Sequence, residues 1–308
     1  MKNRLLLLMA CTFATLSLFA PAFAANLGTA NDYNLFVFED FYAQTGSGIG
    51  GNVAIGGNAY MSSYSVARQL QGNNAKLVVD GDLTWEVYGT VGNDGSGNIY
   101  VGGTPNIHSN VTYNEPCLPQ NIVDFSAARS YLNQASSIWS TQASTGTVSL
   151  EWGTLDLVGS STELNVFNLT TQELDINTLN ITAPADSTVL VNVSGSNVIM
   201  ENFGMFLKNG LTSNYVLFNF YEATSLKLTG CEFNGSILAP DAAIDFQYPI
   251  LNGTLIGKSI GEPYTRCGTM YHVPFQGDLP AVPEPATLLL FVSGAFLLAE
   301  KKKIKFKQ

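Results

Sequence analysis

The sequence predicts an all-β fold, a β-helix or β-solenoid with one flanking α-helix, from three observations. Residues 46–103 hold 14 of the 29 glycines, in runs where two or three apolar residues precede a Gly-Asn or Gly-Asp turn. The second half repeats apolar-polar-apolar triplets between turns, and one stretch between the halves has helical spacing. Short strands with tight corners suit stacked coils, whereas the alternative, a β-sandwich or jelly roll, needs longer strands.

The chain begins with the three regions of a secretory signal peptide, in the order that export requires. Basic residues precede an apolar run over residues 5–20, and small residues follow at Ala22 and Ala24. We therefore expect residues 1–24 to be removed by cleavage before Ala25. The body, residues 25–281, then lies in a compartment that permits disulfides.

The glycine-rich segment carries carboxylates in its turns. Asp80 and Asp82 flank a glycine, and Asp94 lies in a loop of Asn, Gly and Ser residues. Hard oxygen donors beside flexible glycines make these three residues candidates for a calcium site. However, the spacing of a calcium loop and the repeated calcium nonapeptide are absent, so turn chemistry is the simpler explanation.

A single helix is predicted over about 124–142, because its apolar residues recur at spacings of three and four. Asp124 is the candidate N-cap, and Gly146 lies beyond the expected end. We expect the apolar stripe to pack along the flank of the solenoid without binding a ligand. The stripe consists of Phe125, Ala128, Leu132, Ala135, Ile138 and Trp139.

The triplets of the second half alternate at period two, which turns one face of each strand inward. The triplets include Leu155-Asp156-Leu157, Leu164-Asn165-Val166, Leu179-Asn180-Ile181, Val191-Asn192-Val193 and Leu226-Lys227-Leu228.

Aromatic residues could bind sugars if their rings were exposed. The alternating run 35–38 near the start of the body favours burial of its rings.

Charge limits the classes of partner. Residues 25–281 hold seven basic and 22 acidic residues, a net charge of −15. Such a body repels nucleic acid, anionic lipid and acidic polysaccharide, and leaves neutral or cationic partners open.

Candidate catalytic groups are few. His108 and His272 are the only histidines, and neither lies in a nucleophile motif. Carboxylate pairs such as Asp241 and Asp245 would do glycosidase work only if they faced a common cleft. A glycan-active enzyme, a glycoside hydrolase or lyase on a β-helix, is therefore kept as the alternative to a binding protein.

Three cysteines remain after the signal peptide: Cys117, Cys231 and Cys267. At most one disulfide can form among them, and the sequence does not choose between Cys117–Cys267 and Cys231–Cys267. No Cys-x-x-Cys spacing indicates zinc.

The C-terminus combines a short motif, Pro283-Glu284-Pro285, with an apolar run over 286–299 and a basic tail. A helix of that run would span about 21 Å, less than the hydrocarbon core. Residues 282–308 resemble the PEP-CTERM sorting signal of Gram-negative, exopolysaccharide-producing bacteria. The resemblance implies that an exosortase removes the tail at the inner membrane; a permanent anchor is the alternative.

The body resembles the choice-of-anchor A family, whose secreted domain is joined to different C-terminal anchors. The resemblance covers most of residues 27–279 and implies an adhesin-like, β-helical surface or matrix protein without known catalytic residues. The segments that carry it are Asn31-Asp32-Tyr33-Asn34-Leu35-Phe36-Val37-Phe38, Gly50-Gly51-Asn52-Val53-Ala54-Ile55-Gly56-Gly57, Leu77-Val78-Val79-Asp80-Gly81-Asp82-Leu83, Val216-Leu217-Phe218-Asn219-Phe220 and Asn234-Gly235-Ser236-Ile237-Leu238-Ala239-Pro240.

Together these patterns predict a secreted, non-catalytic protein. It would be anchored transiently in the inner membrane and then retained at the cell surface or in the extracellular matrix. There it would bind or scaffold neutral exopolysaccharide or cell-surface components of a biofilm, with no cofactor required. Ice binding is disfavoured, because the expected ladder of Thr-x-Thr strands is missing.

Overall fold

The computed structural model describes residues 26–282, except 46–47, 120–121 and 264–265. Residues Asn26–Leu279 form one compact unit. Within the described residues, no helix is long and apolar enough to cross a membrane. The expected cleavage residues Ala22, Ala24 and Ala25, the motif Pro283-Glu284-Pro285 and the apolar run 286–299 lie outside the described residues.

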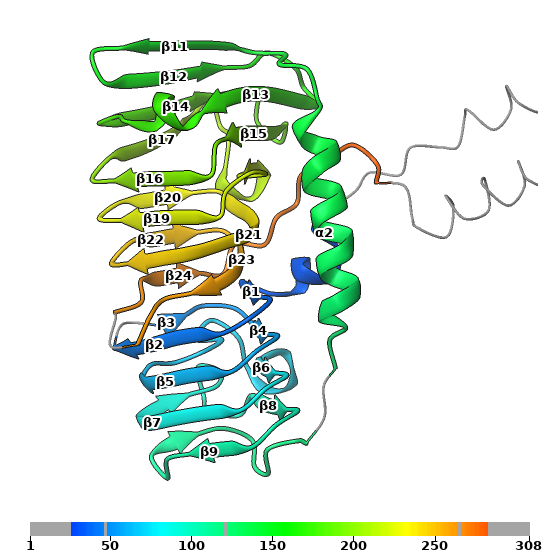
Figure 1. Ribbon diagram of the computed structural model, residues 1–308, viewed down its shortest axis with the longest axis vertical. Coiled ribbons are helices and arrows are strands. Elements are labelled where there is room, and N and C mark those ends of the chain that lie inside the picture. Colours follow the sequence, from blue (N-terminus) through cyan, green and yellow to red (C-terminus); the bar gives the residue numbers. More distant parts are fainter. Residues whose placement is uncertain (1–25, 46–47, 120–121, 264–265, 283–308) are drawn as a thin grey trace, which may run out of the picture. The chain divides into compact units, whose positions relative to one another are not determined.

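The unit Asn26–Leu279 is a β-solenoid with one α-helix along its side, which confirms the predicted fold class (Figure 1). Strands of successive coils pair in parallel, so each coil presents three sides that stack on those of the next. Within the described residues a 16-stranded sheet covers two sides, and two 4-stranded sheets form the third.

We name the sides the helix side, the middle side and the open side. The helix side consists of β13 (Leu164–Thr170), β15 (Thr188–Ser194), β18 (Val216–Asn219), the first part of β21 (Ser236–Gln247), β23 (Leu255–Ile260), β1 (Leu35–Val37), β4 (Val53–Ile55), β6 (Lys76–Val79) and β8 (Asn98–Val101). The middle side consists of β16 (Asn197–Glu201), β19 (Ser225–Thr229), the second part of β21, the end of β23, β2 (Phe41–Thr45), β5 (Ala59–Ser63), β7 (Leu83–Thr90) and β9 (Pro105–Ile107).

The open side consists of β11 (Thr147–Glu151), β12 (Thr154–Val158), β14 (Thr178–Thr182), β17 (Gly204–Lys208), β20 (Glu232–Asn234), β22 (Ile250–Asn252), β24 (Thr269–Tyr271) and β3 (Gly48–Ile49). β10 (Val111–Thr112) pairs with the last residues of β7. Short 3-10 helices are η1 (Gly28–Asp32), η2 (Gly72–Asn74), η3 (Thr171–Leu174) and η4 (Ser213–Tyr215).

The coils do not stack in the order of the chain. Leu35 of β1 lies opposite Val53 of the next coil on one edge and opposite Leu255 of β23 on the other. The N-terminal coils run from β1 to β9 at one end; α2 (Phe125–Ser140) then passes back along the stack, and the later coils run from β11 back to β1 (Figure 1). The first and last coils therefore meet at a seam inside the stack.

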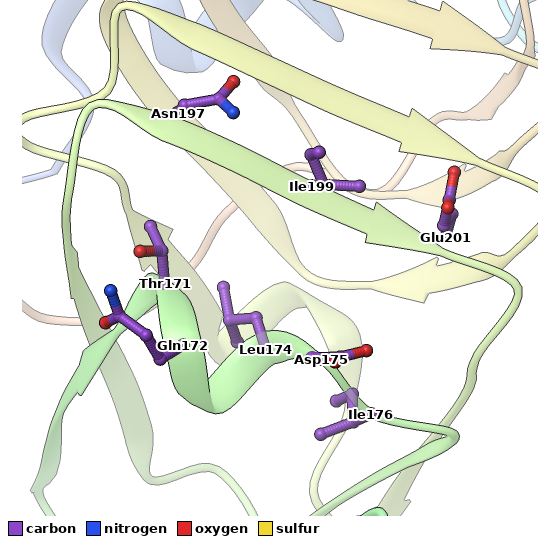
Figure 2. Close-up of a pocket in the computed structure, with 8 residues that line it drawn as sticks. All are labelled: Thr171, Gln172, Leu174, Asp175, Ile176, Asn197, Ile199 and Glu201. Carbon is purple, nitrogen blue, oxygen red and sulfur yellow. The ribbon is translucent and has the colours of Figure 1, made fainter.

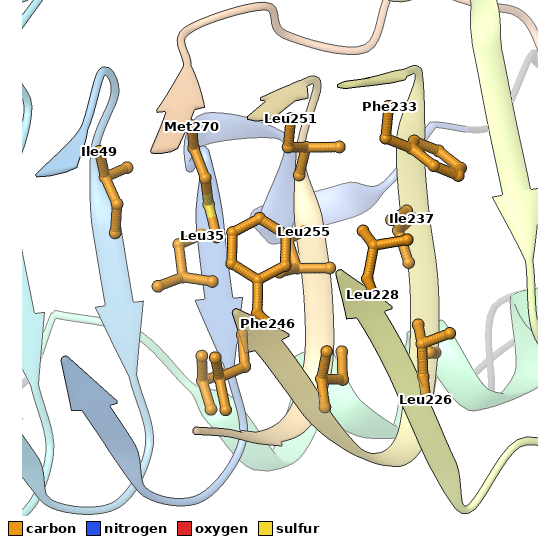
Figure 3. Close-up of a cluster of buried hydrophobic side chains, with 14 of the residues drawn as sticks. Leu35, Ile49, Leu226, Leu228, Phe233, Ile237, Phe246, Leu251, Leu255 and Met270 are labelled. Carbon is orange, nitrogen blue, oxygen red and sulfur yellow. The ribbon is translucent and has the colours of Figure 1, made fainter. Parts of the chain in front are cut away.

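Inward side chains of the three sides form one continuous apolar core. Leu226 and Leu228 of β19 are fully buried while Lys227 between them points outward, as the triplet pattern predicted. Figure 3 shows the core at the seam, where Leu35 and Leu255 lie beside Phe246. Close packing of this kind ties the stability of each coil to its neighbours.

Helix α2 was predicted within two residues of its observed ends. Asp124 is its N-cap, because its Oδ1 accepts a hydrogen bond from the Ala127 backbone N–H (2.8 Å). The helix covers outward apolar side chains of the solenoid; the Phe36 ring, for example, lies 5.2 Å from that of Phe125. This cover explains why helix-side strands such as β18 are buried at every position.

A row of asparagines fastens α2 to the solenoid. Asn219 Nδ2 donates to the Ser136 carbonyl and to Asn192 Oδ1 (2.9 Å each), and Ser136 Oγ donates to Asn219 Oδ1 (2.6 Å). Asn192 Nδ2 in turn donates to the Trp139 carbonyl (2.9 Å). Asn219 and Asn192 are buried, so without these bonds their amide groups would have no hydrogen-bond partner.

Candidate functional site

The open side carries most of the large apolar side chains that the described residues leave exposed. The middle side also exposes Val87, Tyr88 and Ile199, and the rings of Tyr42 and Tyr60 stack there at 4.8 Å. Several exposed apolar side chains gathered on one side make that side the candidate binding surface. The open-side group and its adjoining corners consist of Leu150, Trp152, Val158, Phe206, Tyr248, Ile250 and Tyr271.

Six outward residues form a single row along the open side, which we call the amide–aromatic row. Parallel register places Asp156, Asn180 and Phe206 in line on β12, β14 and β17, and Asn234, Asn252 and Tyr271 in line on β20, β22 and β24. Asn234 Nδ2 joins the two halves by donating to the Met205 carbonyl (3.2 Å).

Hydrogen bonds along the row fix its amides. Asn180 Nδ2 donates to Asp156 Oδ1 (2.9 Å), and Asn252 Nδ2 donates to Asn234 Oδ1 (2.9 Å). Asn252 Nδ2 also donates to Glu232 Oε1 (3.0 Å), and Phe206 and Tyr271 lie at the two ends of the Asn234–Asn252 pair. Such a row offers hydrogen bonds between two apolar platforms.

Beyond Tyr271 the row ends in a groove of about 270 Å³. Its floor is open because Gly48 and Gly50 have no side chains; a Cβ on Gly50 would meet Gln69 Oε1 and the His272 backbone. Gln69 Oε1 accepts a hydrogen bond from the His272 N–H (2.6 Å), and partial burial lowers the pKa of His272. The groove is lined by Gly48, Gly50, Arg68, Gln69, Thr269, Met270 and Tyr271.

A second groove, of about 320 Å³, lies between η3 and β16, where the upper coil has no middle-side strand (Figure 2). Asp175 and Glu201 both line it, the kind of carboxylate pair that the enzyme alternative requires. Glu201, however, is held in an ion pair with Lys227 (2.7 Å), and Leu174, Ile176 and Ile199 make up much of the remaining wall. The groove therefore results from a missing strand in the sheet, and its two carboxylates do not form an acid–base pair.

The calcium candidates lie in corners of the N-terminal coils. Asp82 belongs to a corner ladder: Asp40 Oδ1 accepts from the Asn58 N–H (2.7 Å), Asn58 Oδ1 from the Asp82 N–H (2.9 Å), and Asp82 Oδ1 from the Thr104 N–H (2.7 Å). Each side chain thus holds the turn of the next coil.

Asp80 lies before this corner, after β6, and Asp94 accepts hydrogen bonds from the Ser96 N–H and Oγ–H, which lower the pKa of Asp94. The structure does not bring Asp94 to the corner ladder. In the part of the chain that the structure describes, no group of three or more His, Cys, Asp or Glu side chains is placed to hold a metal ion.

The three cysteines are free thiols in the structure. Tyr64 Oη donates to Cys267 Sγ (3.4 Å) and to the Gly268 carbonyl (3.1 Å) in the core. Burial raises the pKa of Cys267 to about 11 and that of Cys231 to about 12.

Sequence reasoning missed Phe206 and Tyr271. The available signal was a conflict of pattern: in β17 a phenylalanine occupies the outward position, where the neighbouring strands β12 and β14 carry Asp156 and Asn180. An aromatic residue at the polar position of a repeated triplet predicts an exposed ring on that side of the coil.

The fold is thus a β-helix that exposes a row of amides and aromatic rings on one side. Residues 26–264 match the family model described as "Putative Ice-binding-like adhesive domain", and the chain belongs to that family. The family is described as adhesive, in agreement with the predicted non-catalytic binding role. No curated protein matches the chain in sequence.

Several solved structures are similar to the chain. The ice-binding protein 1 domain of Shewanella frigidimarina is 14% identical, with a TM-score of 0.45, and the match covers 84% of this chain and 99% of that one. The ice-binding protein of the Antarctic ascomycete Antarctomyces psychrotrophicus is 16% identical, with a TM-score of 0.36 and coverage of 85% and 99%. An ice-binding protein from an Antarctic biological consortium is 14% identical, with a TM-score of 0.40 and coverage of 83% and 92%.

The family match corrects the resemblance drawn from the sequence. The body is an ice-binding-like adhesive domain, not a choice-of-anchor A domain, and the PEP-CTERM assignment with its exosortase finds no support. The segments that suggested choice-of-anchor A are the short strands and Gly-Asn corners of the coils, such as 50–57 and 77–83. Solenoids of unrelated families share these features, because the geometry of a coil demands them.

Proposed function

We propose that this protein is an exported adhesin that binds neutral polysaccharide through the open side, at the cell surface or in the extracellular matrix. Residues 1–24 would act as the signal peptide, with cleavage before Ala25. The observation that carries the proposal is the amide–aromatic row, in which Phe206 and Tyr271 stand at the two ends of the Asn234–Asn252 pair.

The spacing of the row suits an extended sugar chain. β17 ends one 4-stranded sheet and β20 begins the other, with β22 and β24 next in line; three strand spacings of about 4.8 Å would place the two aromatic rings on the order of 14 Å apart along the stack. Pyranose rings in an extended polysaccharide repeat at nearly the strand spacing. Two sugars could therefore stack on the aromatic rings while the two between them meet the amides of Asn234 and Asn252.

The charge of the body and the shape of the open side limit the class of ligand. The body's net charge of −15, with Asp156 and Glu232 on or beside the row, disfavours acidic polysaccharide. The protruding rings, the groove beyond Tyr271 and the charge of Lys208 make the face uneven, which suits a polymer better than a flat ice surface.

The test is affinity electrophoresis of the protein in gels that contain neutral or acidic polysaccharides. Phe206→Ala and Tyr271→Ala should each weaken binding to a neutral glucan about tenfold, which corresponds to about 1.4 kcal/mol. Tyr88→Ala is the matched control, because Tyr88 on β7 is as exposed as Phe206 (56% against 55%) but lies off the row. Unfolding temperatures of all three variants are measured to show that they remain folded.

Two results would contradict the proposal: binding to no neutral polysaccharide, or binding that Phe206→Ala and Tyr271→Ala leave intact. Adsorption to ice crystals, measured in parallel, would assign the face to ice instead. Binding is expected to persist in EDTA; its loss there would favour calcium at Asp80, Asp82 or Asp94.

A further inference from the structure

The two ends of the solenoid differ in how their last strands are covered. At the N-terminal end, Leu118 returns over β8 by exchanging backbone hydrogen bonds with Ile99 and Val101 (2.8 and 2.9 Å), and Asn114 Nδ2 donates to Asn98 Oδ1 (2.7 Å). At the other end, β11 is the terminal strand of its sheet and pairs with β12 alone among the described strands. No other described strand pairs with its outer edge, which therefore presents backbone donors and acceptors to a partner.

β11 lacks the features that protect edge strands. Thr147–Glu151 contains no proline and no lysine, and its only charge is Glu151 at the end. Val148 and Leu150 lie opposite Leu157 and Leu155, so they point toward the core side, yet Leu150 remains 44% exposed. The core is thus uncovered at this end.

Trp152, in the turn after β11, is 99% exposed. It is the largest apolar side chain available to a partner that approaches this edge. Indole rings of this kind are among the side chains most enriched at protein interfaces.

We propose that a second copy of this chain docks on β11, antiparallel, about a two-fold axis at Ser149. This register pairs each Val148 with Leu150 of the second copy and so covers the open core from both sides. It also places each Glu151 opposite Thr147 of the other copy, which keeps the two carboxylates at opposite ends of the interface. The 4-stranded sheet of each copy would continue into the other.

The interface is small, which sets the expected affinity. Two five-residue strands and two indole rings bury less than the roughly 1,200 Å² of a standard interface, so dissociation in the micromolar range is expected. The dimer would form where the protein is concentrated.

Sedimentation velocity on the purified protein from about 0.1 to about 100 μM, which brackets that affinity, tests the proposal. Acrylamide quenching follows the same series. Trp85 and Trp139 are buried (1% and 0% exposed), so the quenchable emission comes from Trp152. Dimer formation should rise with concentration, and the quenchable fraction should fall in step.

Leu150→Lys should abolish the dimer while the unfolding temperature stays near that of the wild type. Val158→Lys is the matched control: Val158 lies on the same hairpin and is equally exposed (46%), but it is not on the free edge. A protein that stays monomeric throughout, or a dimer that survives Leu150→Lys or dissociates equally in Val158→Lys, would overturn the proposal.

Discussion

Replacing Asn219 with alanine tests whether the asparagine row holds α2 on the solenoid. Asn219 is fully buried and makes three hydrogen bonds, to the Ser136 carbonyl, the Ser136 hydroxyl and Asn192. Asn219→Ala removes all three hydrogen bonds, and because the site is buried, no water replaces the lost amide as a partner.

A neutral hydrogen bond contributes about 1 kcal/mol, and a buried group left unsatisfied costs about 1–3 kcal/mol. Three bonds therefore give an expected loss of about 2–4 kcal/mol in the free energy of unfolding. In a body of this size each kcal/mol lowers the unfolding temperature by about 2–4 °C, so we expect a fall of about 4–16 °C.

The assay is urea unfolding followed by circular dichroism, with a double-mutant cycle. Ser136→Ala removes the hydroxyl partner, so the double variant should lose at least 0.5 kcal/mol less than the sum of the single losses. Asn168→Ala is the control, because Asn168 belongs to the same row but is exposed, and it should cost less than about 1 kcal/mol. Additive effects, or a loss from Asn219→Ala no larger than from Asn168→Ala, would refute the reasoning.

Three further predictions concern reactivity, pH and packing. Burial raises the pKa of all three thiols, but only Cys117 is half-exposed, so in the folded protein at about pH 8 iodoacetamide should label Cys117 before the buried Cys231 and Cys267; peptide mass spectrometry measures the order. The thiols of Cys231 and Cys267 have a pKa near 9 when unfolded, but of about 12 and about 11 when folded. Their contribution to the free energy of unfolding is therefore present below pH 9 and is lost as the pH rises from 9 through the folded values. Urea unfolding at several pH values measures this loss. Leu251→Ala, in the fully buried core, should cost about 2–5 kcal/mol, whereas Arg129→Met, which removes half-exposed ion pairs, should cost less than about 1 kcal/mol; equal losses would contradict the packing described above.

Local patterns in the sequence were sufficient for the coils and the helix. The period-two triplets show which residues face inward, and the stripe after Asp124 sets both the length and the buried face of α2. The same triplet nevertheless has different environments: Asn180 is on the surface of the open side, while Asn192 is buried beneath α2. The triplet alone does not say which side of the coil it occupies.

The seam and the amide–aromatic row depend on contacts between distant residues. Nothing near Leu35 indicates that Leu255 is its partner, because any apolar strand of the right length fits that edge. The row forms only once coils of unequal length are aligned, which brings Asn234 beside Met205. Sequence spacing therefore predicted the single coil, but not the surface that forms when the coils stack.

The order of synthesis differs from the order of stacking in this protein. Asn34 donates a hydrogen bond to the Gly253 carbonyl, a residue 219 positions later, so the first coil made is completed by one of the last. Until β23 has emerged, the N-terminal coils keep an uncovered edge and core, a state prone to aggregation, and closing so long a loop is slow. An ordinary repeat protein can be shortened from its C-terminus one repeat at a time. Here, losing β23 and β24 would instead expose the middle of the stack. The stability of the first coils therefore depends on the last ones synthesised.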